Sequence, residues 1–293
     1  MTTKDARVET PEGNSLACDS IGAGEPVILL HGAGQTRHAW ARTAAALADA
    51  GYRAITFDAR GHGDSDWTDA YGIPPNVTDL RAVVAQLCPP GARPAIIGAS
   101  MGGLTGIAAL GGDNPLPASS LVLVDIAPRF QREGTGPILD FMAANPNGFA
   151  SVEEAADAVA RYMTDRPRPR NAAGLRKNLR LKNGRYHWHW DPAFMDPAVN
   201  RDFGNRRFDL DAASARIAVP VMLVYGEHSK VVNAQSVAHL RALLPDAETA
   251  RVEGAGHMVA GDANNPFTEN ILGFLESHYP AEAPSRGAGA VSR

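Results

Sequence analysis

A serine flanked by glycines is the residue of this chain whose surroundings best suit nucleophilic chemistry. The stretch Gly98-Ala99-Ser100-Met101-Gly102-Gly103 follows the apolar run Pro94–Ile97 and precedes a helix candidate, Leu104–Leu110. This order predicts a strand, a strained turn with Ser100 at its tip, and a helix whose first N–H groups can bind an oxyanion. The pattern also fits an ordinary Gly-rich turn between a strand and a helix. The segments around it must decide between the two.

The serine turn is one of several strand ends in a chain where apolar strands alternate with helices. The predicted strands are an N-terminal hairpin of Arg7–Thr10 and Ser15–Ser20, then Val27–Leu30, Arg53–Phe57, Ala95–Gly98, Leu121–Val124, Val219–Tyr225 and Thr249–Val252. The predicted helices are His38–Ala50, Asn76–Leu87, Leu104–Leu110, Ala234–Leu243 and Asn264–Ser277. This alternation predicts a mostly parallel sheet with helices on both faces, and ligands bind at the carboxyl ends of such strands.

The alternation stops between Arg129 and Ala215, a segment that is aromatic and rich in Arg and Pro. We interpret residues 129–215 as an insertion and residues 1–128 and 216–279 as one core. Residues 280–293 consist mainly of Ala, Gly, Pro and Ser, and we expect a disordered tail there.

Composition limits the partners and the compartment. The 293 residues are 44% hydrophobic, enough for a large core, and the net charge of -4 offers no basic face for nucleic acid. Two cysteines cannot build a disulfide framework, and no apolar run approaches the roughly 18 residues that span a bilayer. We expect a cytoplasmic protein with a small-molecule substrate, no nucleic acid, no membrane, no metal and no cofactor; the oligomeric state stays open.

Four segments together resemble the α/β-hydrolase fold superfamily over nearly the whole chain. They are His31-Gly32-Ala33-Gly34, the stretch from Asp58 to Ser65, Gly98 to Gly103, and Gly254-Ala255-Gly256-His257. The resemblance implies an α/β fold with a mostly parallel eight-stranded sheet. It also implies a helical cap after the sixth strand, made by residues 129–215, and a pocket between cap and sheet.

The resemblance also assigns roles to the residues at the strand ends. Ser100 is the nucleophile, and His257 is the base, since an imidazole can take the serine proton near neutral pH. The backbone N–H groups of Ala33 and Met101 form the oxyanion hole. We expect His31 to brace the oxyanion loop beside the substrate. For His257 a surface histidine in a Gly-rich loop remains the alternative.

The acid of the triad departs from the commonest family pattern. Many relatives carry Gly-x-x-Asp after the seventh strand, but here Gly226 is followed by Glu227, His228 and Ser229. A hydroxyl cannot stabilise an imidazolium as a carboxylate does. Some members hold the acid after the sixth strand, where Asp125 stands. We assign Asp125 as the acid, with Glu227 as the alternative; Asp125 can also cap the turn into the insertion.

The insertion supplies candidate substrate contacts. If Tyr186–Trp190 is extended, Trp188 and Trp190 share one face and either line an apolar pocket or pack the cap onto the core. Nine basic residues lie between Arg161 and Arg185 with Asp165 as the one acid. They can attract a carboxylate or form a solvated helix face.

These residues predict a serine hydrolase of ester or lactone bonds that works through an acyl-enzyme on Ser100. The same residues would serve a carbon–carbon bond hydrolase of ring-cleavage products, whose acidic substrates suit a basic cap. A ligand receptor that keeps the triad is the non-enzymatic alternative. Relatives that hydrolyse epoxides or haloalkanes use a carboxylate nucleophile, which Ser100 disfavours.

Overall fold

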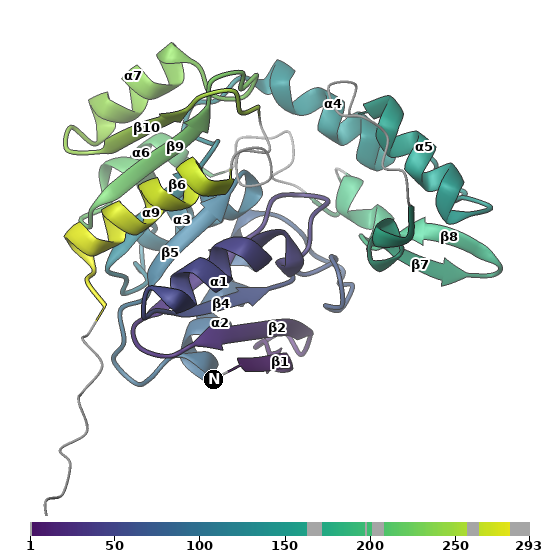
Figure 1. Ribbon diagram of the computed structural model, residues 1–293, viewed down its shortest axis with the longest axis horizontal. Helices are drawn as coiled ribbons and strands as arrows, with labels where there is room; N and C mark the ends of the chain where they lie inside the picture. Colours follow the sequence, from purple (N-terminus) through teal and green to yellow (C-terminus); the bar gives the residue numbers. More distant parts are fainter. Residues whose placement is uncertain (1, 163–171, 197, 201–207, 257–263, 282–293) are drawn as a thin grey trace, which may run out of the picture.

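The protein is built on an eight-stranded sheet, seen in a computed structural model that describes residues 2–162, 172–196, 198–200, 208–256 and 264–281 (Figure 1). Its strands are β1 (Thr2–Glu9), β2 (Ser15–Gly22), β3 (Pro26–Leu30), β4 (Arg53–Phe57), β5 (Ala95–Ala99), β6 (Ser120–Val124), β9 (Val221–Gly226) and β10 (Glu248–Val252). The spatial order is β1-β2-β4-β3-β5-β6-β9-β10. β1 and β2 pair antiparallel, as does β2 with β4, and the other pairs are parallel. The predicted mostly parallel eight-stranded sheet is confirmed.

The core helices follow the predicted order with shifted ends. They are α1 (Ala41–Asp49), α2 (Ile73–Leu87), α3 (Met101–Gly111), α6 (Leu210–Ala215), α7 (Ala234–Leu243) and α9 (Asn264–His278). A short 3-10 turn, η1 (Arg37–Trp40), precedes α1. α2 begins at Ile73 rather than Asn76. Its first turn contains Pro74 and Pro75, which are tolerated there because the first N–H groups of a helix have no partner within the helix. In the described ranges no helix is long and apolar enough to cross a membrane.

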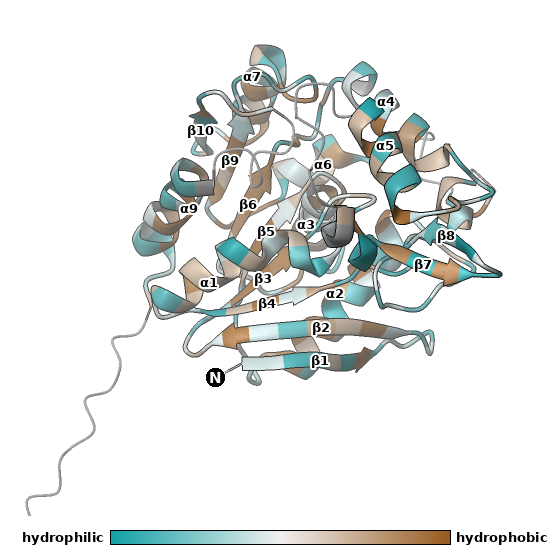
Figure 2. Ribbon diagram, turned by 45° about the vertical axis from the view of Figure 1, so that its right-hand side comes forward, coloured by the Kyte–Doolittle hydropathy of each residue, from teal (hydrophilic) through white to brown (hydrophobic). Residues whose placement is uncertain are grey.

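Helices cover both faces of the sheet, and each central strand contributes side chains to a hydrophobic core on each face. In β3, Ile28 and Leu30 belong to the core with α2 and α3, whereas Val27 and Leu29 belong to the core with α1 and α9. The brown strands between amphipathic helices in Figure 2 show the same arrangement. A strand buried on both faces has little freedom to shift. The residues that follow β3, β5, β6 and β9 are therefore positioned by rigid elements at one edge of the sheet.

The two cysteines are buried, free thiols. Burial raises the pKa of Cys18 to about 12 and that of Cys88 to about 11. Neither thiol is therefore a ready nucleophile near neutral pH.

The described part of the insertion after β6 contains helices, as predicted, and also a two-stranded hairpin that was not predicted. Its described elements are α4 (Arg132–Ala143), α5 (Val152–Tyr162), η2 (Ala172–Asn178), the antiparallel strands β7 (Leu179–Lys182) and β8 (Arg185–Trp188), and η3 (Pro192–Met195). Asn183 and Gly184, with φ of 51° and 73°, form the two-residue turn that joins β7 to β8. An Asn-Gly pair favours such a hairpin turn because both residues tolerate positive φ.

The end of the predicted insertion packs with the core. α6 lies against α3, and its Ala213 is fully buried in the core shared with α2 and α3. We use "cap" below for residues 129–200 where the structure describes them.

Candidate active site

Ser100 is the single residue that connects β5 to α3. β5 ends at Ala99 and α3 begins at Met101, and Ser100 has φ 47° and ψ -112°, which is unusual for a residue with a side chain. The Ser100 N–H donates to the Val124 carbonyl at 3.1 Å, and its carbonyl accepts from the Leu104 N–H at 3.1 Å. These two bonds hold the strained turn in place.

The neighbouring glycines are required by close packing. A Cβ on Gly98 would overlap the backbone of Gly102, and a Cβ on Gly102 would lie 2.5 Å from the Leu30 carbonyl oxygen. Real Cβ atoms are not found that close to backbone atoms, so α3 approaches β3 and β5 only because side chains are missing here. The sharp strand-to-helix turn predicted from the sequence is therefore present, with Ser100 at its tip.

The two predicted oxyanion donors flank this serine. Met101 is the first residue of α3, where backbone N–H groups lack partners within the helix. The oxyanion loop, residues 31–34, lies beside it, since a Cβ on Gly32 would be 3.4 Å from the Ser100 Cβ. Both predicted donors thus come from segments that border Ser100.

His31 orients the Ala33 amide. Its Nδ1 donates to the Gly32 carbonyl at 2.8 Å, and the Gln35 N–H donates to the same oxygen at 3.1 Å. A trans peptide points its carbonyl and its N–H in opposite directions, so anchoring the Gly32 oxygen also fixes the direction of the Ala33 N–H. His31, 1% exposed, lies in the position expected of a brace for the loop rather than of a titrating base.

Asp125 is held by the loop that follows β9. It has φ 49° and is 1% exposed, and its N–H donates to the Val224 carbonyl at 2.8 Å. Oδ1 accepts from the Gly226 N–H at 3.1 Å, and Oδ2 accepts from the Ser229 hydroxyl at 2.7 Å. The carboxylate that follows the sixth strand thus lies against the loop where many relatives carry their acid.

Glu227, the alternative acid, is exposed. Its Oε2 accepts from the Gly254 N–H at 3.0 Å, and this bond holds the pKa of the carboxyl below its usual value. An Arg251 Nη2 lies 3.8 Å from its other oxygen. These contacts tie the loop after β9 to the loop after β10, which suits a structural brace.

His257 lies outside the described residues, but the chain leading to it is described. The His228 N–H donates to the Ala255 carbonyl at 2.9 Å, and Gly226 packs directly against the backbone of Ala255 and Gly256. Gly226 is also the residue whose N–H binds Asp125. The last described residue before His257 therefore lies at the same edge as Asp125.

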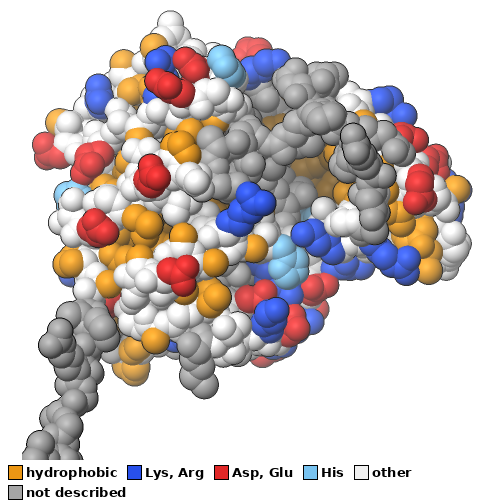
Figure 3. All heavy atoms as spheres, in the orientation of Figure 1, with side chains coloured by type: hydrophobic (Ala, Val, Ile, Leu, Met, Phe, Trp, Pro, Cys, Tyr) orange, Lys and Arg blue, Asp and Glu red, His pale blue; other side chains and the backbone are white. Residues whose placement is uncertain are grey.

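A cavity of about 410 Å³ joins Ser100 to the cap. Its described lining includes the oxyanion loop and four cap aromatics, Phe141, Tyr162, Trp188 and Trp190. Trp188 and Trp190 stack with ring centroids 5.0 Å apart, as the alternation predicts for an extended segment. Among the described lining residues, Lys177 is the one Lys, Arg, Asp or Glu. Hydrophobic side chains are visible in the recess between cap and core (Figure 3).

Comparison with known proteins identifies the fold. A family model described as the alpha/beta hydrolase fold matches residues 25–263. The chain belongs to the α/β-hydrolase family. It is 28% identical over 269 residues to an sn-1-specific diacylglycerol lipase of Xenopus laevis, covering 87% of this chain and 80% of the relative. It is 27% identical over 259 residues to a 2-(acetamidomethylene)succinate hydrolase of Mesorhizobium japonicum, covering 87% and 90%.

A solved structure supports the same fold. The crystal structure of an E-2-(acetamidomethylene)succinate hydrolase superposes with a TM-score of 0.78 at 23% identity, covering 94% of this chain and 100% of the other. The family and its hydrolase relatives support a hydrolase.

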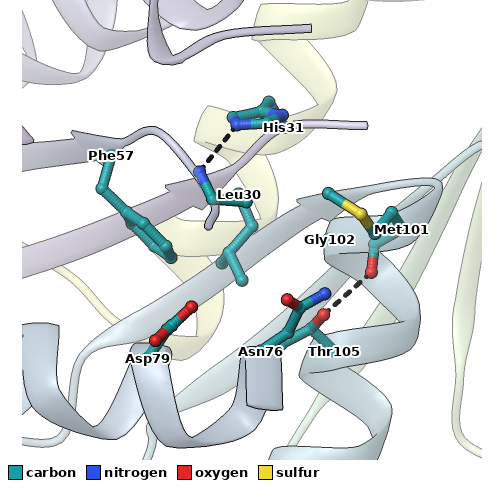
Figure 4. A pocket seen from close by; sticks show the side chains of 9 residues that line it. Leu30, His31, Phe57, Asn76, Asp79, Met101, Gly102 and Thr105 are labelled. Carbon is teal, nitrogen blue, oxygen red and sulfur yellow. Dashed lines mark hydrogen bonds between the residues drawn. The ribbon is translucent and has the colours of Figure 1, made fainter. Parts of the chain in front are cut away.

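A second, water-sized cavity lies behind Met101, a predicted oxyanion donor, in this α/β hydrolase. Its volume is about 10 Å³, room for roughly one water, and its lining includes His31, Asn76, Asp79 and Thr105. The Thr105 hydroxyl donates to the Met101 carbonyl at 3.0 Å (Figure 4). The first turn of α3 is thus held by a side-chain hydrogen bond on its inner side.

Three buried imidazoles surround the oxyanion loop and are neutral. His31 Nε2 accepts from the Ala59 N–H at 2.9 Å, His62 Nε2 from the Gly34 N–H at 3.1 Å, and His189 Nδ1 from the Gly63 N–H at 2.9 Å. Burial lowers the pKa of all three rings, and it lowers that of His189 to about 4. Nothing short-range in the sequence indicated that His189 joins the two core histidines.

We expect the free energy of unfolding to fall as the pH drops from 7 to 5. His189 has a pKa near 6.5 when unfolded and about 4 when folded, so the unfolded chain binds the proton first. The contribution of neutral His189 to the free energy of unfolding is fully present above about pH 6.5. Protonation in the unfolded chain lowers the free energy of unfolding by about 2 kcal/mol at pH 5. Urea unfolding at each pH measures it, and His189→Gln should flatten the slope. A wild-type free energy that does not change between pH 5 and 7 contradicts the neutral cluster.

Among the described basic residues of this run, Arg180 binds the core, whereas Arg185 binds within the cap. Arg180 in β7 donates to the Gly63 carbonyl and pairs with Asp64, both at 2.5 Å. Arg185 in β8 donates to the Asn147 carbonyl at 2.7 Å. Basic and acidic side chains gather along the border between cap and core in Figure 3. Of the described basic residues in this run, Lys177 is the one that lines the large cavity.

Proposed function

We propose that this α/β hydrolase cleaves carboxylic esters through an acyl-enzyme on Ser100. The observation that carries the proposal is the strained Ser100 turn beside the oxyanion loop, with Asp125 fixed at the same edge of the sheet. His257 completes the triad as the general base, and the chain that leads to it approaches this edge.

The reaction follows from these groups. His257 takes the proton of the Ser100 hydroxyl while Oγ bonds to the ester carbonyl carbon, and Asp125 stabilises the imidazolium. The amides of Ala33 and Met101 bind the oxyanion of the tetrahedral intermediate. The bond between the former carbonyl carbon and the alkoxy oxygen then breaks, and the alcohol leaves with the proton that His257 held. A water repeats the sequence on the acyl-enzyme and releases the carboxylic acid.

The cavity favours an uncharged, apolar group next to the scissile bond. Its volume of about 410 Å³ and its aromatic cap residues suit an aryl or medium-length acyl chain. Lactones and thioesters react by the same steps. Lys177 favours a second candidate, a carbon–carbon bond hydrolase of ring-cleavage products, because its ammonium can pair with a substrate carboxylate.

A fluorophosphonate probe tests the proposal directly. We expect one adduct, on Ser100, and no adduct in Ser100→Ala. A panel of p-nitrophenyl esters graded by acyl length, with matched acyl groups that end in a carboxylate, then identifies the substrate class. Folded wild-type protein that neither labels nor turns over any ester contradicts the hydrolase and favours a ligand receptor of the same fold.

A further inference from the structure

The oxyanion loop of this protein is held from the cap as well as from the core. His189 follows β8, and its Nε2 donates to the Gly34 carbonyl at 3.3 Å while its Nδ1 accepts from the Gly63 N–H at 2.9 Å. The ring is 1% exposed, with the Trp190 ring edge-on at 5.2 Å. A side chain of the cap thus bridges two loops that follow β3 and β4.

Both polar backbone groups of Gly34 are bound by imidazoles. His62 accepts from the Gly34 N–H at 3.1 Å, and the two rings lie 6.0 Å apart. Gly34 has φ 73°, a conformation open to glycine but also one that glycine leaves easily, because no Cβ restricts it. The hydrogen bonds to His62 and His189 therefore restrict a position whose own backbone preference is weak.

Fixing Gly34 fixes the Ala33 amide from its second side. The peptide before Ala33 is anchored through the Gly32 carbonyl by His31 and Gln35. The peptide after Ala33 contains the Gly34 N–H, which His62 binds. The next peptide contains the Gly34 carbonyl, which His189 binds. Three consecutive peptides are thus restrained, and the restraint on the last of them comes from the cap.

Other bonds join the described parts of the cap and the core at the loop after β4. Arg180 binds the Gly63 carbonyl and Asp64, and the Asp191 N–H donates to the Gly61 carbonyl at 2.8 Å. These bonds fasten the cap to the loop after β4. A mutation at Arg180 can therefore weaken the contact between cap and core without removing a hydrogen bond to the oxyanion loop.

We propose that His189 is a positioning residue that couples the cap to the oxyanion hole by holding Gly34 and, through it, the Ala33 N–H. The inference rests on the proposed function, since it assigns Ala33 a role in binding the oxyanion. Negative charge on that oxygen develops fully only in the tetrahedral intermediate. A misdirected donor therefore lowers kcat while leaving KM for the uncharged ester nearly unchanged.

The test compares His189→Ala and His189→Gln with Arg180→Ala as the matched control. Gln can offer both an N–H donor and a carbonyl acceptor, so it should retain more activity than Ala. We expect His189→Ala to lower kcat by about 10- to 100-fold, less than the full loss of an oxyanion donor, with KM within about threefold. A trifluoromethyl ketone, whose adduct with Ser100 carries the oxyanion, should lose affinity by the same factor. The alcohol product should bind as in the wild type.

Hydrogen exchange of the peptide that covers residues 31–36 provides a readout independent of turnover. Exchange should accelerate in His189→Ala and stay at the wild-type rate in Arg180→Ala. The inference is overturned if folded His189→Ala keeps its kcat within twofold, if Arg180→Ala loses as much, or if exchange in residues 31–36 is unchanged. A wild-type protein that turns over no ester and binds no ketone instead defeats the proposed function, and the exchange data then decide alone whether His189 restrains the loop.

Discussion

Replacing Ser100 with alanine is expected to lower kcat for a p-nitrophenyl ester by about 10⁴-fold or more, because a triad without its nucleophile keeps only binding and oxyanion stabilisation. The measurement is initial rate against ester concentration. Ser277→Ala is the matched control, since Ser277 is exposed and its hydroxyl donates to the Gly273 carbonyl on α9, far along the chain from the turn. The control should keep the wild-type rate.

The Ser100→Ala variant should remain folded, so a loss of rate reports on chemistry. The bonds that hold the turn use the backbone N–H and carbonyl of residue 100, which alanine keeps. Thermal unfolding should occur within a few degrees of the wild-type midpoint, and the alcohol product should still bind. Folded Ser100→Ala protein with undiminished ester turnover would assign the nucleophile elsewhere.

Short-range patterns located the core and its strand ends. The doubly buried strand β3 appears in the sequence as a continuous apolar run, and the glycines around Ser100 are placed by contacts within a few residues of chain or with the adjacent strand. Local signals of this kind depend on side-chain size and spacing, which can be read directly from the sequence. The positions of residues 31–34 and of Asp125 at strand ends could be predicted because each directly follows such a strand.

The cap contains one element, the hairpin of β7 and β8, that the resemblance does not imply. Its sequence was interpreted as helical, although the pair Asn183-Gly184 is a strong hairpin signal between residues that alternate. Arg180 lies on that hairpin and reaches Asp64, a partner more than a hundred positions away. An ion pair across such a separation leaves no periodic pattern in the chain.

The contacts that tune the candidate site are also long-range. Ser229 donates to Asp125, and His189 binds Gly34 and Gly63, but each pair is brought together by packing of whole elements. The sequence indicated that Ser229 occupies a position where many relatives carry an acid. It could not indicate that the hydroxyl would turn toward the carboxylate on the neighbouring strand end, because that depends on the parallel pairing of β6 with β9.

Asp125→Asn is expected to lower kcat by about 10²- to 10⁴-fold, because an amide cannot stabilise the imidazolium that forms when His257 takes the Ser100 proton. Asparagine is the substitution least disturbing to the backbone, since it tolerates the φ of 49° found at this position. Its side-chain oxygen can still accept from the Gly226 N–H. Steady-state kinetics on the ester used for Ser100→Ala measure the loss.

Glu227→Gln is the matched control for the same chemical change. Its carbonyl oxygen can keep the bond from the Gly254 N–H, and the side chain is exposed, so we expect kcat within about threefold of the wild type. The opposite pattern is a lowered kcat in Glu227→Gln and a wild-type kcat in Asp125→Asn. It would assign the acid to the end of β9, where many relatives carry it. Asp125 would then be a buried cap for the Gly226 N–H and the Ser229 hydroxyl, and the hydrogen bond between Ser229 and Asp125 would be structural.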